Sequence, residues 1–389
     1  MTYPEVVIIG GGIIGCACAY YLAQEGVSVH LVEKGAIGDG ASKAGMTHIV
    51  TWEEPEIHLH LARESNRLYQ ELSQVLPMDI EYRQSGSIAI VERPEDMASF
   101  GETVRRLQDW GVKCQLLSAA ELVSMEPNLA PDVGGGAYFE EDAQVNPLYA
   151  TQAMACAAKE RGAVIETFSE VIGIECTSDH RRVTAVQTVR GRIPCEKIVI
   201  AAGAWSGQIA KMVNLEVPIS PRKGTLVVTA PLPEDLFRCK ILLAAGYMDS
   251  VREGASGGVA VAANVQQVKN GNLLLGSSRQ FVGFDASVDP RVVSMMMKRN
   301  LRFFPALAKV TAIRTWAGFR PYTPDLLPII SAVDTIPGLY IAAGHEGIGI
   351  TEAPITGKLI SQIITGQTPN LPLGLLSLSR FKETLKNLI

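Results

Sequence analysis

The stretch from Val6 to Glu33, VVIIGGGIIGCACAYYLAQEGVSVHLVE, decides the fold of this chain. Gly10, Gly12 and Gly15 give the spacing GxGxxG between an apolar run and a segment with helical periodicity. Such glycines allow a tight turn, close approach of the backbone to a pyrophosphate and close packing of a helix on a strand. The phosphates would lie at the unpaired amides of the helix N-terminus. The stretch therefore predicts a strand, a dinucleotide-binding turn, a helix and a second strand.

Glu33 ends the predicted second strand, where a carboxylate can accept hydrogen bonds from both ribose hydroxyls of an adenosine. An acid at this point disfavours a 2′-phosphate, so FAD or NAD is favoured over NADP. The alternative is an ordinary glycine-rich turn between a strand and a helix. The order of strand, helix and acid disfavours that alternative.

The composition is that of a compact enzyme. The chain has 389 residues, of which 47% are hydrophobic and 19% charged, and this length predicts two domains with a large core. The formal net charge is −5 and the sequence contains no basic cluster, so we do not expect it to bind nucleic acid.

Cysteine and histidine usage predicts a cytoplasmic protein without a metal site. The seven cysteines are an odd number and are scattered without a CxxC pair, which indicates reduced thiols. His58 and His60 cannot share a helix face at a spacing of two, and His48 has no nearby ligand partner. The first fifteen residues lack a basic segment and a cleavage site, and no apolar run reaches the ~18 residues of a membrane span.

The segment from 35 to 50, GAIGDGASKAGMTHIV, is too rich in glycine and small residues for a helix or a regular strand. A loop that leaves the carboxyl end of the second strand lies beside the dinucleotide crevice. Ser42 could pass close to a second phosphate. Lys43 either screens phosphate charge or is simply solvated, and the sequence leaves both open.

Residues 79–145 carry no phosphate motif and are interpreted as part of a substrate domain. The patterns before and within this block predict helices over 55–76 and 94–110, a hairpin over 81–91, a capping box at Ser118 and Glu121, and a strand over 135–145. Asn146 and Pro147 then cap and start a helix that ends before Gly162.

The segment KIVIAAGAWSGQIA, residues 197–210, predicts a return to the nucleotide domain. Its apolar strand ends in small residues, which again allow a ligand to approach the backbone closely. A second strand-rich block follows over 218–285, with a turn at Asn270 and Gly271, and we expect it to complete the substrate sheet. Asp289 and Pro290 start a helix that runs to about residue 304.

A second glycine-rich junction lies near the end of the chain, in GLYIAAGHEGIGITEAPITGKLISQII, residues 338–364. A strand opens through Gly344, Gly347 and Gly349 into a helix whose positive end could face an electron-rich group. Two such junctions favour a flavin over a nicotinamide, since FAD has two charged regions to hold.

Four segments in this order resemble the D-amino-acid-oxidase-like (DAO) family of FAD-dependent oxidoreductases across essentially the whole chain. They are the GxGxxG stretch with Glu33, the strand with AAGAW, WAGFRPYTPDLLPII over 316–330 and GHEGIGITEAPITG over 344–357. Within the family, the chain most resembles a group of amino-acid-oxidising members. They are glycine oxidase, sarcosine oxidase and the flavin subunits of proline, hydroxyproline and opine dehydrogenases and of hydrogen cyanide synthase.

The resemblance implies an α/β fold in which a Rossmann-like FAD-binding domain is interleaved with an α+β substrate domain that contains a large mixed sheet. We assign residues 1–78, 146–215 and 316–389 to the first domain, and 79–145 and 216–315 to the second. The implied FAD-binding residues are Gly10, Gly12, Ile13, Ile14, Gly15, Glu33, Lys34, Ala41, Ser42, Lys43, Ala44, Gly45, Met46, Val171, Ala202, Gly203, Trp205, Gly344, His345, Glu346, Gly347, Ile348, Gly349, Ile350 and Thr351.

Gly318 bears on how the cofactor is attached. Monomeric sarcosine oxidases, as members of the family, carry a cysteine just upstream of the TPD motif that bonds FAD covalently. Gly318 stands at the nearest equivalent position here. We therefore expect FAD to be bound noncovalently.

Arg320 is the principal substrate residue that the resemblance implies, because the arginine of the WAGxRP motif pairs with a substrate carboxylate in this family. The alternative is an ion pair with Asp325. Met46, Asn264 and Glu346 are further candidates for the substrate pocket.

Two of these positions depart from glycine oxidase, which has a tyrosine aligned with Asn264 and an arginine aligned with Glu346. Tyr247 could replace that tyrosine or belong to a surface loop. His345 and Glu346 could shape the flavin site, form an electron exit or merely cap a helix.

The implied activity is oxidation of the C–N bond of a small amino or imino acid, of the D-proline, hydroxyproline, sarcosine or glycine class. A hydride passes to flavin N5 and an imine forms, with the chain acting as a dehydrogenase that hands electrons to a partner subunit. The alternatives are an oxidase that forms hydrogen peroxide, a flavoprotein subunit inactive outside a complex, and an NAD-dependent dehydrogenase. An oligomer is compatible with each of them.

Overall fold

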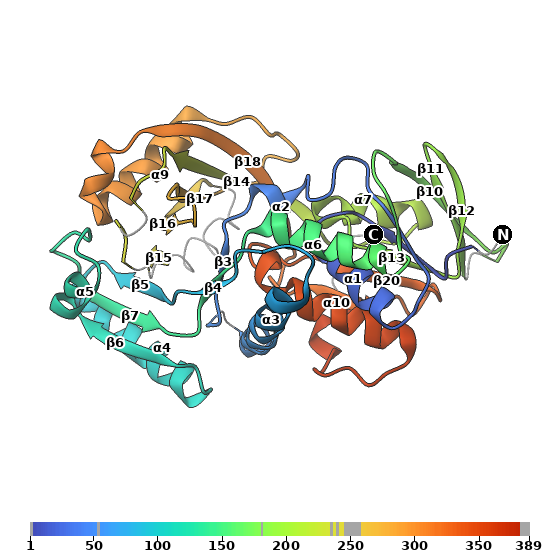
Figure 1. Cartoon of the computed structure of the whole chain (residues 1–389), viewed down its shortest axis with the longest axis horizontal. Helices are drawn as coiled ribbons and strands as arrows, with labels where there is room; N and C mark the ends of the chain where they lie inside the picture. The colour runs from blue at the N-terminus through green and yellow to red at the C-terminus, as the bar shows by residue number, and fades with distance from the viewer. Residues whose placement is uncertain are drawn as a thin grey trace.

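Two large β-sheets, one in each half of the molecule, organise the fold (Figure 1). The structure is a computed structural model that describes residues 3–52, 55–179, 182–233, 236–238, 241–244 and 258–381. Tyr247 and the rest of the stretch 247–257, singled out from the sequence, lie outside the described residues.

The sheet that begins with the N-terminal strand has six strands among the described residues, and all are parallel except β19, which runs antiparallel to β20. The central strand β1 is fully buried, as its run of β-branched residues predicts. In order across the sheet, the strands are β19 (Ile329–Ala332), β20 (Leu339–Ala343), β13 (Lys197–Ile200), β1 (Val6–Ile9), β2 (Val29–Val32) and β9 (Val164–Glu166).

Helix α1 (Ile13–Gln24) is buried along almost its whole length because α6 (Pro147–Glu160) and α10 (Gly349–Thr365) pack against it. Gly357 allows the closest of these contacts. A Cβ atom there would lie 2.5 Å from the Ala17 carbonyl carbon, so α10 approaches the backbone of α1 directly. The predicted caps of α6 are confirmed, since the Asn146 side chain accepts a hydrogen bond from the Tyr149 amide.

The second sheet has eight strands among the residues described and mixes parallel with antiparallel pairs. Helix α9 (Pro290–Phe303) covers β16 and β17, and α4 (Met97–Asp109) covers β6 and β7. In order, the strands are β18 (Ala312–Tyr322), β14 (Ser220–Thr229), β17 (Leu273–Arg279), β16 (Ala260–Gln267), β15 (Ile241–Ala244), β5 (Ser87–Val91), β7 (Gly135–Phe139) and β6 (Cys114–Ser118).

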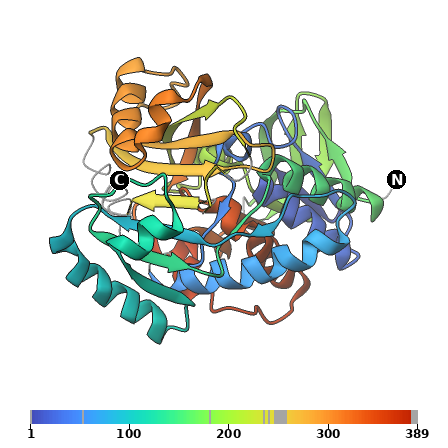
Figure 2. The same cartoon turned by 60° about the vertical axis from the view of Figure 1, so that its left-hand side comes forward.

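Smaller elements complete the fold. Helix α3 (Glu56–Val75) lies where the two halves meet (Figure 2), and it contributes Leu61 to one core and Leu59 to the other. The remaining elements are α2 (Ala41–Ala44), α5 (Ala119–Met125), α7 (Ser206–Ala210), β3 (His48–Ile49), β4 (Arg83–Gln84), β8 (Ala143–Gln144), β10 (Val171–Cys176), β11 (Val183–Thr188), β12 (Gly191–Pro194) and 3₁₀ turns at Pro94–Asp96, Gly203–Trp205, Lys211–Val213, Pro305–Lys309, Gly374–Leu376 and Leu378–Phe381.

The structure corrects two predictions. The expected hairpin over 81–91 is wrong, because β4 pairs with β8 while β5 pairs with β7 and β15 in the large sheet. The loop over 35–50 contains the single-turn helix α2 and the strand β3, which its glycine-rich sequence does not indicate.

The assigned domain boundaries stay a prediction, and the boundary at 316 falls within β18, which belongs to the eight-stranded sheet.

Candidate active site

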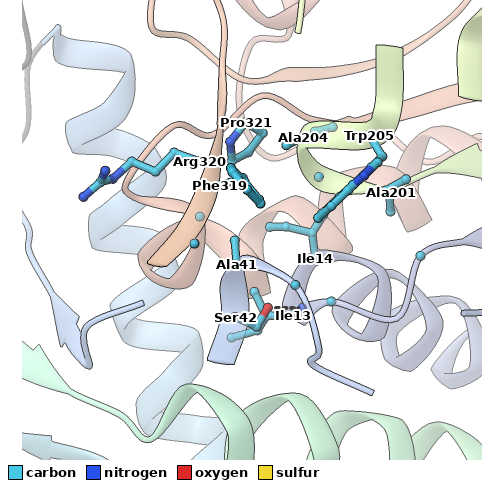
Figure 3. Close-up of a pocket in the computed structure, with 18 of the residues that line it drawn as sticks. Ile13, Ile14, Ala41, Ser42, Ala201, Ala204, Trp205, Phe319, Arg320 and Pro321 are labelled. Atoms are coloured by element: carbon cyan, nitrogen blue, oxygen red, sulfur yellow. Dashed lines mark hydrogen bonds between the residues drawn. The ribbon is translucent and has the colours of Figure 1, made fainter. Parts of the chain in front are cut away.

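A long cavity lies between the carboxyl ends of the parallel strands and the face of the eight-stranded sheet (Figure 3). The turn after β1, the loop before β3, the 3₁₀ turn after β13 and the junction between β20 and α10 line one side. Strands β14, β16, β17 and β18 line the other. Segments far apart in the sequence therefore meet at one site.

The turn after β1 is built for close backbone packing and leaves one open face. A Cβ atom at Gly10, which has φ of +116°, would lie 2.5 Å from the Ala201 carbonyl oxygen. A Cβ atom at Gly15 would overlap the Gly10 carbonyl oxygen. At Gly12 the nearest neighbour would be Ser42 Oγ at 3.5 Å, so the backbone is exposed to the cavity there. This is the geometry that a pyrophosphate requires.

The Glu33 carboxylate is fixed at the end of β2 by backbone amides. Gly11 N–H donates to Oε2 at 2.6 Å, and Gly35 N–H donates to Oε1 at 2.7 Å. Glu33 also lines the cavity, as its predicted role in binding the ribose requires.

Ser42 ties helix α2 to the start of α1. Its buried hydroxyl accepts a hydrogen bond from the Ile13 amide at 2.9 Å, and the two residues lie side by side in Figure 3. The glycine-rich loop is thereby held against the N-terminus of α1, so both can contact the same phosphates.

The junction between β20 and α10 forms a second glycine-rich turn between a strand and a helix, like the turn between β1 and α1. Gly344 has φ of +89° and Glu346 has φ of +45°, so the chain reverses in left-handed conformations before α10 begins. His345 is buried, and its Nε2 lies 2.9 Å from the Thr356 hydroxyl. Burial, with a smaller effect of His58, lowers the pKa of His345 to about 3, so this side chain is neutral at physiological pH.

These residues fit FAD, since the cavity joins the two turns and leaves the backbone open at Gly12. Most of the predicted cofactor residues line it, and five do not: Gly15 packs under the turn, and Lys43, Gly344, Ile348 and Thr351 lie outside the lining. The predicted residues that line the cavity are Gly10, Gly12, Ile13, Ile14, Glu33, Lys34, Ala41, Ser42, Ala44, Gly45, Met46, Val171, Ala202, Gly203, Trp205, His345, Glu346, Gly347, Gly349 and Ile350.

Two predictions concern residues near the glycine-rich turns. The sequence leaves open whether Lys43 screens phosphate charge or is solvated, and Gly318 leads to the expectation that FAD is bound noncovalently. The Lys43 ammonium group contacts the Asp39 carboxylate, and both side chains are about half exposed. A Cβ atom at Gly318 would overlap the Cβ of Ala44, so β18 packs directly on α2. A larger side chain at 318 would have to displace α2.

Arg320 extends from β18 away from Trp205 (Figure 3), and its guanidinium group lies over Gly224 of β14. Its Nη1 donates to the Ser278 carbonyl oxygen at 3.0 Å, and a Cβ atom at Gly224 would overlap the guanidinium group. Arg320 lines the cavity with Met46, Asn264 and Glu346, so the structure brings the predicted substrate residues together. The alternative partner Asp325 instead accepts hydrogen bonds from Arg380, at 2.6 Å from Nε.

Three arginines of the described chain surround the buried carboxylate of Glu346. Its Oε1 lies 3.3 Å from Arg222 Nη1, 3.7 Å from Arg279 Nε and 3.9 Å from Arg320 Nε. Burial alone would raise the pKa of Glu346, but the three guanidinium groups outweigh it and lower that pKa. Glu346 is therefore ionised, and it pairs with the arginines at this end of the cavity.

Several cavity-lining residues are not identified by sequence reasoning, among them His48, Ser277 and Phe319. His48 lies in the glycine-rich loop, three positions after its last glycine, Gly45, and that place is the signal that could have marked it. Burial and the charge of Arg320 lower the pKa of His48 to about 4, so it is neutral at physiological pH. Ser277 carries no such signal, because only the pairing of β16 with β17 brings it to the cavity.

Trp205 closes the rim of the cavity in an aromatic cluster. Its ring stacks on Phe284 at 5.0 Å and meets Phe319 edge-on at 6.1 Å. The Lys34 ammonium lies 3.8 Å from the Trp205 ring centroid. The cluster joins the nucleotide side of the cavity to the loop after β17.

Metal-binding clusters, membrane-spanning helices and cysteine pairing are the remaining features considered among the described residues. In the described parts of the chain, no cluster of three or more histidine, cysteine, aspartate or glutamate side chains is arranged to hold a metal ion. Among the same residues, no helix combines the length and apolar character needed to span a membrane. The six cysteines that the structure describes are free thiols.

The fold is that of a flavoprotein oxidoreductase, and its cavity joins two glycine-rich turns at one end to Arg320 at the other. The chain belongs to the FAD dependent oxidoreductase (DAO) family, whose model matches residues 5–363, and FAD is its cofactor. The predicted family, fold class and cofactor are confirmed.

The chain is similar to several characterised members of the family. Glycine oxidase of Geobacillus kaustophilus is 30% identical over 386 residues, which cover 97% of each protein. Hydrogen cyanide synthase subunit HcnC of Pseudomonas protegens is 28% identical over 417 residues, 96% of this chain and 94% of that protein. The solved structure of L-proline dehydrogenase from P. horikoshii superposes with a TM-score of 0.89 at 26% identity and covers 98% of each chain.

Proposed function

We propose that this enzyme oxidises the C–N bond of a small amino or imino acid to an imine. When bound, FAD supplies the oxidant that accepts the hydride from the substrate carbon. The class of substrate extends to D-proline, hydroxyproline, sarcosine and glycine. Relatives named as glycine oxidase and L-proline dehydrogenase support it.

The observation that carries the proposal is the placement of Arg320. Arg320 lines the cavity, and its guanidinium group donates to the Ser278 carbonyl oxygen and lies over Gly224. A guanidinium group suits two-point binding of a carboxylate. Arg320 would anchor the substrate carboxylate and so set the distance between the substrate carbon and the cofactor.

The other residues orient the substrate and exclude water. Met46 packs with Leu226 and Leu274 to form an apolar surface beside the arginine. His48 is neutral, so it adds no charge that would oppose loss of a hydride from an uncharged amine. Orientation by these groups does not require a side-chain base.

We propose a dehydrogenase that passes electrons to a partner subunit, in a cytoplasmic enzyme that can form an oligomer. Similarity to L-proline dehydrogenase and to a subunit of hydrogen cyanide synthase supports the transfer to a partner. An oxidase that forms hydrogen peroxide is the second candidate, because the relative at 30% identity is named glycine oxidase.

Anaerobic mixing with a panel of amino acids tests the proposal. The purified flavoprotein would be mixed with glycine, sarcosine, D- and L-proline, hydroxyproline and D-alanine while its flavin absorbance is followed. At least one of them is expected to bleach the flavin, and recolouring that stays slow after air is admitted supports the dehydrogenase. Rapid recolouring supports the oxidase, and no bleaching by any amino acid contradicts the proposed function.

A further inference from the structure

Three uncharged polar side chains form a patch on the wall of the cavity, and we refer to His48, Asn264 and Ser277 as the polar wall. Asn264 is 1% exposed and Ser277 is 2% exposed. Neither the amide oxygen nor the amide nitrogen of Asn264 has a hydrogen-bond partner, and the same is true of Ser277 Oγ and His48 Nδ1. Buried polar groups are nearly always paired, so this patch calls for a ligand.

The polar wall is held in place from behind. The Asn300 side chain accepts a hydrogen bond from the backbone N–H of Asn264 at 3.2 Å and donates one to the Gly276 carbonyl oxygen at 2.9 Å. Strands β16 and β17 are thereby fixed at the two points that present Asn264 and Ser277.

The polar wall lies within reach of a substrate anchored at Arg320. The guanidinium group lies over Gly224 on β14, and β17 separates β14 from β16, which carries Asn264. The register places Gly224 level with Ser278, whereas Asn264 pairs with Gly276, two residues further along the strand. At about 4.8 Å per strand and about 3.3 Å per residue, the two backbone positions are about 12 Å apart. Hydrogen bonds of about 2.9 Å at each end leave about 6 Å between the groups that they bind, which is four or five covalent bonds.

We propose that the polar wall binds a second, uncharged polar group of the substrate, such as a hydroxyl on the β- or γ-carbon. The inference rests on the proposed function, and it narrows the substrate to a hydroxylated or otherwise polar amino or imino acid. The group is uncharged because the wall offers only neutral donors and acceptors, and the pKa of His48 keeps its ring neutral. A substrate without that group leaves buried polar atoms unpaired, which penalises its binding.

Matched substrate pairs test the inference on the holoenzyme. The rate of anaerobic flavin reduction would be measured with proline and 4-hydroxyproline, and with alanine and serine, using both enantiomers of each. The hydroxylated member of at least one pair is expected to be about 10- to 100-fold more efficient. Equal efficiency within both pairs overturns the inference, as does a preference for aspartate or glutamate over the hydroxylated compounds.

Variants separate recognition from structure. Asn264→Leu, which keeps the number and branching of the side-chain heavy atoms, and Ser277→Ala should each lower efficiency mainly for the hydroxylated substrate and reduce the preference to less than about threefold. Ser206→Ala is the matched control, because this buried serine lies outside the cavity lining. An equal loss for both members of a pair indicates a structural role and overturns the inference.

Failure of the inference and failure of the proposed function give different results. If amino acids bleach the flavin but show no preference within the pairs, only the polar wall is wrongly assigned. If no amino acid bleaches it, the proposed function itself is contradicted. Should Asn264→Leu not fold, Ser277→Ala and the comparison with the unmodified enzyme still decide the outcome.

Discussion

The glycine-rich end of the cavity and the Arg320 end present different recognition groups. At the first end, backbone amides and small residues of two strand-to-helix turns face the cavity, with Glu33 among the charged side chains there. At the second end, side chains from β14, β16, β17 and β18 converge. A backbone site depends on local sequence and conformation. A side-chain site depends on strand pairing and can be altered one residue at a time.

The largest effect is expected at the backbone end. Gly15→Ala would place a methyl group on the Gly10 carbonyl oxygen, so the turn must open. We expect FAD content to fall below detection and the free energy of unfolding to drop by about 3 kcal/mol. Flavin absorbance per protein and chemical denaturation measure both quantities.

Gly26→Ala is the control for this change. Gly26 has φ of +77°, but no atom lies within 4 Å of its added Cβ. We expect a destabilisation of about 1 kcal/mol with FAD retained. Equal loss of FAD in both variants would contradict the role of close packing in the turn.

Arg320→Ala should leave FAD binding at the glycine-rich end intact and weaken substrate binding at the Arg320 end. Loss of the guanidinium group is expected to raise the activation free energy for kcat/KM by about 3 kcal/mol, or roughly 100-fold, with FAD content unchanged. Steady-state kinetics with the best amino acid measure the effect. Arg314→Ala on the exposed part of the same strand is the control, and an unchanged KM in Arg320→Ala would show that the carboxylate binds elsewhere.

His345 offers a test through the pH dependence of stability. Its folded pKa of about 3 lies below the usual 6.5, so the unfolded state binds a proton that the folded state does not. Stability is therefore lost as the pH falls from about 6.5 toward 3, at about 1.4 kcal/mol per pH unit, or about 2 kcal/mol at pH 5.

His345→Asn should remove this loss, as measured by denaturation at pH 7 and pH 5. His60→Asn, on the exposed face of α3, is the control and should retain the full dependence. If the profiles of both variants match that of the parent, the folded protein accommodates a charged His345.

The smallest effect is expected from Gly224→Ala. The added methyl group would displace the Arg320 guanidinium, which is the far end of a flexible side chain, so folding should be little affected. We expect KM to rise about 10-fold because two-point binding is misaligned. Gly173→Ala is the control, since its Cβ would meet the nearest atom at an ordinary 3.6 Å. A KM equal to that of the parent would show that Arg320 adapts without loss.

The difference between the two ends also explains what the sequence can predict. The turn at Gly10 to Gly15, the caps at Ser118 and Asn146 and the junction at Gly344 depend on neighbours within a few residues, so their pattern is visible in the chain. The hairpin expected over 81–91 fails because partner choice is a long-range property, which places β4 and β5 in different sheets.

The substrate residues divide in the same way. Arg320 stands in a recognisable motif, whereas Gly224 and Ser277 reach the cavity only through the register of β14, β17 and β18. The cluster of Arg222, Arg279 and Arg320 about Glu346 likewise joins residues from three strands and one turn. No spacing of residues along the sequence predicts such a cluster.

The most direct test of the account compares an amino acid with the amine that lacks its carboxylate, for example proline with pyrrolidine, in anaerobic flavin reduction by the unmodified enzyme. The account predicts that the amino acid bleaches the flavin and that the amine, at the same concentration, does not, because Arg320 has nothing to anchor. Equal bleaching by both compounds would contradict it.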